Sequence, residues 1–146
     1  MIKDILVLKT PRFSDDRGSL TQLFNSKEDL PDIKRMYIVS NFNKDTIRAY
    51  HKNIDEWKYF FVIKGAVKFV LVDDRDDSET FKEKQVIVLS EDNPSLIGIP
   101  PGVYNGWKAL IENSILLGTA DRTIAKHKDE RVPPTSFGNV LETKNR

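Results

Sequence analysis

The chain has no cysteine among its 146 residues, which excludes disulfides and thiolate chemistry. It also has no apolar run near the roughly 20 residues that a membrane-spanning helix needs. Neither sign of charge is in excess, because 23 lysines and arginines stand against 22 aspartates and glutamates, for a net charge of +1. This balance gives no electrostatic reason for binding to nucleic acid or to a membrane surface, so we expect neither as a partner.

The first ten residues, MIKDILVLKT, read as a short strand interrupted by charges and not as a signal peptide, so we expect a cytoplasmic protein. Apolar residues make up 39% of the chain and charged residues 31%, a mixture typical of a globular domain. A length of 146 residues is enough for one domain with its own core. We expect residues 1–146 to form that single domain, with a frayed tail after about residue 135.

Segments rich in β-branched and aromatic residues alternate with turns along most of the chain. The expected strands are residues 2–8, 19–24, 34–40, 47–51, 57–63, 66–72, 80–89, 96–99, 107–110 and 114–119. Many short strands at regular spacing predict a sandwich or barrel, and only 27–30 suggests a helical turn. The charged run at 73–77 reads as a solvated turn, with Arg75 reaching a partner subunit.

Residues 47–65 place Arg48, His51 and Lys58 on neighbouring expected strands. Arginine binds phosphate as a planar fork, histidine accepts a proton near neutral pH, and lysine can stabilise a developing oxyanion. These three residue types suit proton abstraction beside a carbonyl of a phosphorylated substrate. A lone histidine is more often a structural hydrogen-bonding residue, and the spacing by itself does not establish that the three side chains converge.

Five motifs in order extend this pattern over most of the chain. They are Asp16–Gly18, Arg48–His51, Lys58 with 62–72, the charged segment 72–80, and 89–93 running into 99–102. With these motifs the chain resembles the cupin family of sugar-nucleotide epimerases typified by dTDP-4-dehydrorhamnose 3,5-epimerase. It is similar to a shorter branch of that family, which ends near a Pro-Pro segment like Arg131–Pro134. The resemblance implies an all-β fold, a double-stranded β-helix or jelly-roll barrel.

The resemblance also implies an activity. Such a protein is an epimerase or isomerase of a nucleotide-linked 4-keto-6-deoxy sugar, working through an enolate in deoxysugar or polysaccharide biosynthesis. By the resemblance, His51 is the base, Lys58 stabilises the enolate, and Arg17 and Arg48 hold the nucleotide diphosphate. The implied ligand is a nucleotide-diphosphate sugar, with no cofactor. A homodimer is implied too, and the apolar strand at 2–8 is an edge that needs a partner.

The chain departs from the family at three places. After the Pro-Gly turn the family has His-Gly, and this chain has Asn105 before its glycine. The family's catalytic tyrosine corresponds to 121–123, which reads Asp-Arg-Thr here, so we consider Tyr104 and Tyr50 as substitute acids. The carboxylate that orients the base lies in a C-terminal stretch that we expect this shorter chain to lack. Asn105 and Tyr104 are also candidate ligand contacts.

The metal ligands of other cupins are not reproduced. A lysine, Lys58, stands where the glutamate would be needed, and Asn53 and Asn105 stand at two histidine positions. Only His51 remains of four ligands, and His127 has no partner at ligand spacing, so the sequence predicts no metal site.

Two other functions stay open. One is a non-catalytic cupin that binds a sugar nucleotide and has lost the acid. The other is a sugar-nucleotide ketoisomerase, which also works through an enediol but usually keeps a histidine pair, so Asn53 argues against it.

Overall fold

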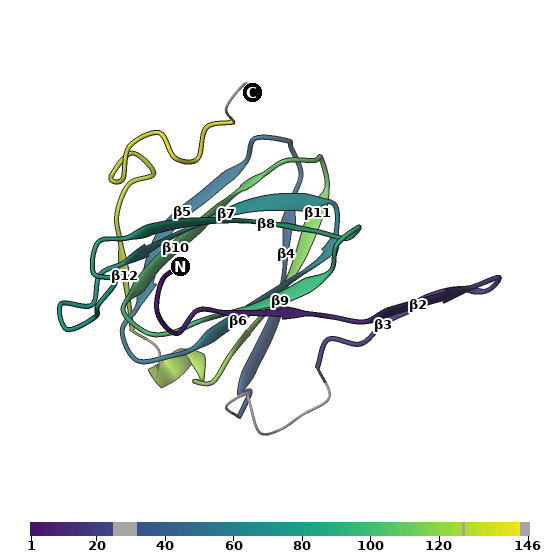
Figure 1. Cartoon of the computed structure of the whole chain (residues 1–146), viewed down its shortest axis with the longest axis horizontal. Helices are drawn as coiled ribbons and strands as arrows, with labels where there is room; N and C mark the ends of the chain where they lie inside the picture. The colour runs from purple at the N-terminus through teal and green to yellow at the C-terminus, as the bar shows by residue number, and fades with distance from the viewer. Residues whose placement is uncertain (25–31, 127, 144–146) are drawn as a thin grey trace.

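A computed structural model of the chain describes residues 1–24, 32–126 and 128–143 (Figure 1). The short helical turn predicted at 27–30 lies outside these residues. The strands are β1 (Leu6–Lys9), β2 (Arg12–Asp15), β3 (Gly18–Thr21), β4 (Arg35–Asn41), β5 (Ile47–Asn53), β6 (Lys58–Lys64), β7 (Ala66–Asp73), β8 (Lys84–Ser90), β9 (Ser95–Ile99), β10 (Val103–Ala109), β11 (Ser114–Ala120) and β12 (Asp129–Arg131). One 3₁₀ turn, η1 (Ile124–Lys126), is the sole helical element in the described part.

The strands form two five-stranded antiparallel sheets. One has the order β1-β9-β6-β11-β4 and the other the order β12-β5-β10-β7-β8, while β2 and β3 form a separate hairpin. This confirms the predicted all-β architecture, with most expected strands present and their ends shifted by a few residues. The sequence did not indicate β2 or β12, because both are short and largely polar.

The core lies between the two sheets, where inward side chains alternate with outward ones along each strand. Phe60 from one sheet meets Phe69 and Trp107 from the other, with ring centroids 5.3 and 5.6 Å away from it. Pairs of this kind contribute roughly 0.5–1.5 kcal/mol each beyond their buried area. Tyr59 and Phe61 flank Phe60 on β6, so they point to the outer face, into a separate apolar cluster.

The C-terminal tail covers the outer face of the second sheet. The ring of Phe137 contacts Tyr50 and Tyr104 at centroid distances of 4.9 and 5.3 Å. Leu141 is buried in the same cluster, and Lys68 Nζ donates to the Glu142 carbonyl at 2.7 Å. The expectation of fraying after about residue 135 is therefore corrected through residue 143, because these apolar side chains have a surface to pack on.

The charged run at 73–77 is only in part a solvated turn, because Asp74, Asp76 and Asp77 are exposed whereas Asp73 and Arg75 are not. Asp73 is fully buried and accepts hydrogen bonds from Arg75 Nε at 2.8 Å, Ser78 Oγ at 2.7 Å and Thr80 Oγ1 at 2.6 Å. Arg75 also binds the Asp4 carboxylate at 2.9 Å. Arg75 thus pairs within its own chain and fastens the N-terminal segment to this loop. Its contact with a partner subunit stays a prediction.

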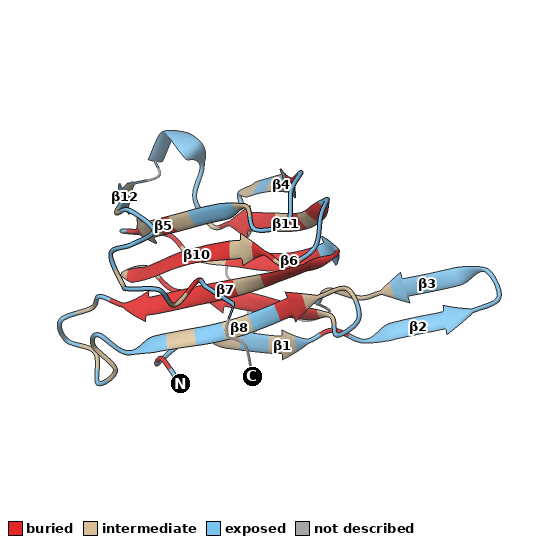
Figure 2. Cartoon of the chain, turned by 90° about the horizontal axis from the view of Figure 1, so that it is seen from above, coloured by how far each residue is buried: buried red, intermediate tan, exposed pale blue. Residues whose placement is uncertain are grey.

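The β2–β3 hairpin extends away from the two sheets (Figure 1). All its residues except Thr21 are exposed, and the pale colour of both strands marks this in Figure 2. Phe13 and Leu20 are 60% and 62% exposed. In the part of the chain that the structure describes, no helix is long and apolar enough to cross a membrane.

Candidate active site

His51 lies on β5 and faces the space between the sheets. It stands opposite Asn105 of β10, which lies between the core residues Val103 and Trp107 on the inward face. The His51 side chain is 35% exposed, so it is reachable from solvent. Its Nδ1 lies 3.5 Å from Oδ2 of Asp129 on β12.

The Asp129 carboxylate lies beside His51, where the sequence led us to expect no carboxylate. Strand β12 pairs with β5, with Asp129 opposite Asn53, two residues along from His51. Side chains two apart on a strand share a face, so the carboxylate and the imidazole meet. The segment around Asp129 is polar and lacks a strand pattern, and only its pairing with β5 reveals the contact.

The surroundings of His51 favour the neutral imidazole. Burial lowers its pKa below the ordinary value of 6.5, the hydrogen bond to Asp129 opposes this, and the charge of Arg131 adds to the lowering. Since Nδ1 faces Asp129, Nε2 is the nitrogen that can take a proton from a substrate. A neutral, oriented imidazole of this kind can act as a general base at neutral pH.

Lys58 begins β6 on the same inward side as Phe60. Its Nζ lies 3.4 Å from Oε1 of Glu56, a fully buried carboxylate that also accepts from Arg35 Nη2 at 3.0 Å. Burial lowers the pKa of Lys58, with Glu56 opposing the shift and Arg35 adding to it. The site therefore holds two cations around one carboxylate, which gives it spare positive charge for a developing oxyanion.

His51 and Lys58 lie on the two facing sheets that form the walls of the site, and charges on each wall shift pKa values on the other. His51 belongs to the β12-β5-β10-β7-β8 sheet and Lys58 to the facing sheet. After burial, the charge of Lys58 is among the causes that lower the pKa of His51, and Asp129 is among those that raise the pKa of Lys58. The structure thus brings the two predicted catalytic residues to one end of the interior, from opposite sides.

Asn105 is buried beside His51. Its Nδ2 donates to the His51 carbonyl at 2.9 Å, so the amide supports the backbone of β5. The next residue, Gly106, sits at a bulge where β5 comes very close: a Cβ there would lie 2.4 Å from Cβ of Ala49. A direct contact of Asn105 with ligand stays a prediction.

Arg48 lies three residues before His51 on β5, about 10 Å away along the strand. Its guanidinium donates to Asn41 Oδ1 at 3.2 Å and to the Ser40 carbonyl at 3.1 Å. These two bonds use Nε and Nη2, and the residue is exposed. The spacing suits a ligand longer than a single sugar ring.

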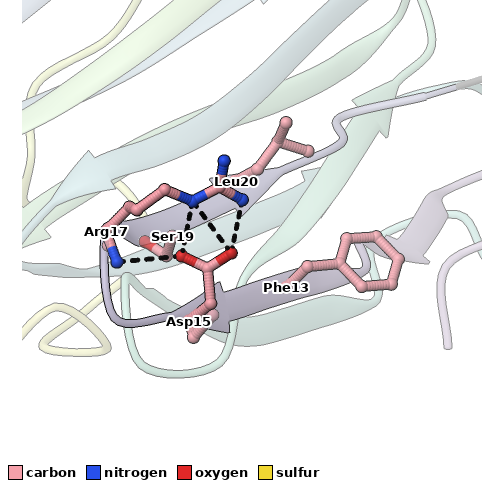
Figure 3. Close-up of a pocket in the computed structure, with 7 residues that line it drawn as sticks. Phe13, Asp15, Arg17, Ser19 and Leu20 are labelled. Atoms are coloured by element: carbon pink, nitrogen blue, oxygen red, sulfur yellow. Dashed lines mark hydrogen bonds and ion pairs between the residues drawn. The ribbon is translucent and has the colours of Figure 1, made fainter.

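Arg17 is not brought to this site within one chain. It sits at the end of the protruding hairpin, with a side chain 86% exposed (Figure 3). There it pairs with Asp15 through Nε at 3.1 Å, in a shallow pocket lined by hairpin residues that include Phe13 and Leu20. The convergence of Arg17 with Arg48 therefore fails for a single copy of the chain.

Tyr104 and Tyr50 point to the wrong side to serve as acids or ligand contacts in this interior. Each is the immediate neighbour of an inward residue, Asn105 or His51, so each faces outward. Both pack on the tail with Phe137, and Tyr104 Oη lies 3.4 Å from Glu130. The candidate roles of Tyr104 and Tyr50 are corrected by this alternation.

Sequence reasoning also missed three side chains that the structure places around Lys58: Arg35, Tyr37 and Glu56. Arg35 and Tyr37 alternate with the exposed Met36 on β4, so the inward face of an edge strand carries polar groups. The alternation of Arg35 and Tyr37 inside with Met36 and Ile38 outside is a signal that the sequence does contain.

His127 lies outside the described residues. Within those residues, no three histidine, cysteine, aspartate or glutamate side chains are grouped so that they could hold a metal ion.

The model of the dTDP-4-dehydrorhamnose 3,5-epimerase family matches residues 1–136. The chain belongs to this family. The dTDP-4-dehydrorhamnose 3,5-epimerase family thus accounts for the motifs seen in the sequence, and the predicted membership is confirmed.

Two relatives in the family have names tied to glycan synthesis. The chain is 33% identical over 117 residues to the spore coat polysaccharide biosynthesis protein SpsL of Bacillus subtilis, covering 80% of this chain and 78% of SpsL. It is 30% identical over 137 residues to the probable low-salt glycan biosynthesis epimerase Agl13 of Haloferax volcanii, covering 90% of this chain and 88% of Agl13.

The family's solved structures share the fold. The dTDP-4-dehydrorhamnose 3,5-epimerase of Bacillus anthracis, solved with TDP and PPi bound, is 29% identical and superposes with a TM-score of 0.82 over 90% of this chain and 80% of that chain. NovW of Streptomyces spheroides, a 4-keto-6-deoxy sugar epimerase, has a TM-score of 0.86 over 95% of this chain and 74% of its own at 17% identity, which bears on the fold alone. The predicted cupin jelly roll is confirmed.

Proposed function

We propose that the protein is an epimerase of a nucleotide-linked 4-keto-6-deoxy sugar that acts in deoxysugar or polysaccharide biosynthesis. The observation that carries this proposal is the pairing of His51 and Asp129 on one wall with Lys58 on the facing wall. A base and an enolate-stabilising cation on opposite walls are what proton abstraction beside a keto group requires. A cytoplasmic location stays a prediction.

In the proposed reaction, His51 Nε2 removes the proton from the carbon beside the keto group. The electron pair left on carbon delocalises onto the keto oxygen, which faces Lys58. Both groups are partly or largely buried, so the attraction between the enolate and the ammonium is stronger than it would be in water. Asp129 holds the imidazole and stabilises the imidazolium that forms.

We further propose that Arg48 binds the diphosphate and that the protein is a homodimer. Arg17 can join such a site only if the hairpin of a second copy reaches it, because within one chain the hairpin points away (Figure 1). The exposed apolar side chains of Phe13 and Leu20 on that hairpin support its docking onto another surface.

One test uses a dTDP-linked 4-keto-6-deoxy sugar in heavy water, with UDP- and CDP-linked versions beside it. The wild-type protein should incorporate deuterium at the carbon beside the keto group. His51→Asn should abolish incorporation, because an amide cannot accept the proton. Lys58→Met should slow it about a hundredfold, the usual scale for one lost oxyanion donor. Lys64→Met, at the exposed end of the same strand, is the matched control.

A binding-only cupin is the second candidate, favoured by the Asp-Arg-Thr sequence at 121–123 where the family has its tyrosine. It predicts nucleotide-sugar binding without deuterium incorporation, and that result would overturn the epimerase proposal. A product with its keto group moved along the ring would instead indicate a ketoisomerase.

A further inference from the structure

Tyr37 is a phenol inside the site for which the reaction above has no use. It lies on the inward face of β4, where its ring packs edge-on against Phe60 at a centroid distance of 6.5 Å. Lys58 Nζ lies 5.7 Å from the ring centroid and Arg35 Cζ lies 5.8 Å from it. The phenol is therefore a direct neighbour of the group that we assign to the enolate.

Gly118 leaves the space that the Tyr37 ring occupies. Strand β11 separates β4 from β6, and Gly118 is the register partner of both Tyr37 and Phe60. A Cβ on Gly118 would lie 2.5 Å from Cε2 and 2.6 Å from Cζ of Tyr37. The missing side chain lets the Tyr37 ring lie across β11 toward Lys58.

Tyr37 also stands on the wall opposite the base. It belongs to the β1-β9-β6-β11-β4 sheet, and His51 belongs to the sheet that faces it. Inversion of a carbon centre requires that a proton leave one face of the sugar ring and return to the other. A donor on the same wall as His51 would restore the original configuration, whereas a donor on the facing wall can invert it.

We propose that Tyr37 is the acid that returns the proton, in place of the tyrosine missing from 121–123. The role rests on the proposed epimerase function. After His51 has taken the carbon-bound proton, the enolate double bond supplies the electron pair for a new C–H bond to the proton of Tyr37 Oη, and the keto group re-forms. The tyrosinate then takes a proton from water and the imidazolium returns one, so the protein ends unchanged.

The electrostatics of Tyr37 suit a donor. Burial raises its pKa to about 12, with Arg35 lowering it and Glu56 raising it further. The phenol therefore carries its proton at neutral pH. Once that proton is transferred, the neighbouring cations of Arg35 and Lys58 stabilise the tyrosinate until it is reprotonated.

The test is Tyr37→Phe, measured with the same 4-keto sugar nucleotide in heavy water. Wild type should both exchange the proton and invert the centre. The variant should keep exchange within a few-fold of wild type and should lose inversion by about a hundredfold or more, the scale of general acid catalysis. Unchanged binding of dTDP and an unchanged melting curve would establish that the variant is folded.

Tyr59→Phe is the matched control, because Tyr59 lies on the outer face of the same sheet and its buried hydroxyl has no hydrogen-bond partner among the described residues. It should invert the substrate as wild type does. Inversion by Tyr37→Phe at the wild-type rate would overturn the proposal, and so would the loss of exchange together with inversion. Absence of exchange in the wild type is a different result, which overturns the epimerase function itself.

Discussion

At the scale of single residues, the two ring nitrogens of His51 have different surroundings. Nδ1 lies 3.5 Å from the Asp129 carboxylate, and Nε2 takes no part in that contact. A carboxylate in this position fixes both the tautomer and the orientation of an imidazole base. The effect depends on a short edge strand, so one substitution in that strand reports on it.

Asp129→Asn should slow deuterium exchange at least tenfold, because the amide NH2 can donate to Nδ1 and so favour the tautomer that carries its proton on Nε2, which cannot accept one. In wild type the exchange rate should rise with pH in the range below 6.5 and then stay level. The reason is that the neutral imidazole is the base and burial lowers the pKa of His51. Asp129→Asn removes a group that raises this pKa, so the rising part of the pH profile of the variant should move to lower pH. Exchange rates from pH 5 to 8 check both expectations.

Glu130→Gln is the neighbouring control. Glu130 pairs with Lys52 at 2.9 Å and approaches Tyr104, on the outer side of the sheet. Its profile should match that of wild type, whereas an unaltered profile in Asp129→Asn would contradict the orienting role.

At the scale of elements, the loop after β7 is built on one buried ion pair. Asp73 is fully buried and the Arg75 side chain is 17% exposed. Burial by itself would raise the pKa of Asp73, but hydrogen bonds from Arg75, Thr80 and Ser78 outweigh it and the pKa is lowered. Gly102 takes part as well, because a Cβ there would lie 2.5 Å from Cγ of Arg75.

Arg75→Met should destabilise the fold by about 3–5 kcal/mol, because it leaves a buried carboxylate without its cation. The midpoint of urea unfolding measures this. In wild type the stability from Asp73 is present above its ordinary pKa of 3.8 and is lost as pH falls below that value, since the folded-state pKa is the lower one.

The control for this loop is Asp77→Asn, in the same charged run but exposed. Its effect should stay within about 0.5 kcal/mol, as for most surface substitutions. Equal midpoints for Arg75→Met and Asp77→Asn would refute the buried-pair account.

The strands also show which parts of the fold and of the site could be predicted from the sequence. Alternation and turn residues locate β4 to β7 well, because those strands bury one or both faces. Strand β12 carries no apolar pattern, since its role is to pair with an edge, and Asp129 was missed with it. Tyr37 was missed because its placement depends on Gly118, its register partner on β11. The register between two strands so far apart in the chain cannot be predicted from the sequence of either strand. Arg17 matched a motif that lies on the protruding hairpin, away from His51 and Lys58.

At the scale of the whole molecule, one hairpin and one edge strand each carry a pair of exposed apolar side chains. Phe13 and Leu20 are exposed on the hairpin, and Met36 and Ile38 are 63% and 66% exposed on the outer face of β4. Such side chains gain about 25 cal/mol for each Å² that a partner removes from water. This distribution supports the proposed homodimer.

We expect sedimentation at micromolar concentration to give a dimer, and Phe13→Ser combined with Leu20→Ser to weaken it. Ile124→Ser, which removes an exposed apolar side chain from η1 instead, should leave it intact. A monomeric wild type would contradict the homodimer.

If the hairpin of one copy completes the site of the other, a mixture of Arg17→Ala and His51→Asn chains should exchange deuterium faster than either variant alone, because a mixed dimer holds one complete site.

The donor and the orienting carboxylate of the proposed reaction both lie on strands that end their sheets. Tyr37 is on β4 and Asp129 on β12, each paired with a single neighbour. Edge strands open at lower free energy than central ones, and they can do so without disturbing the rest. Catalytic competence and global stability are therefore separable here: inversion can disappear on warming while the aromatic core around Phe60 and Trp107 is still intact.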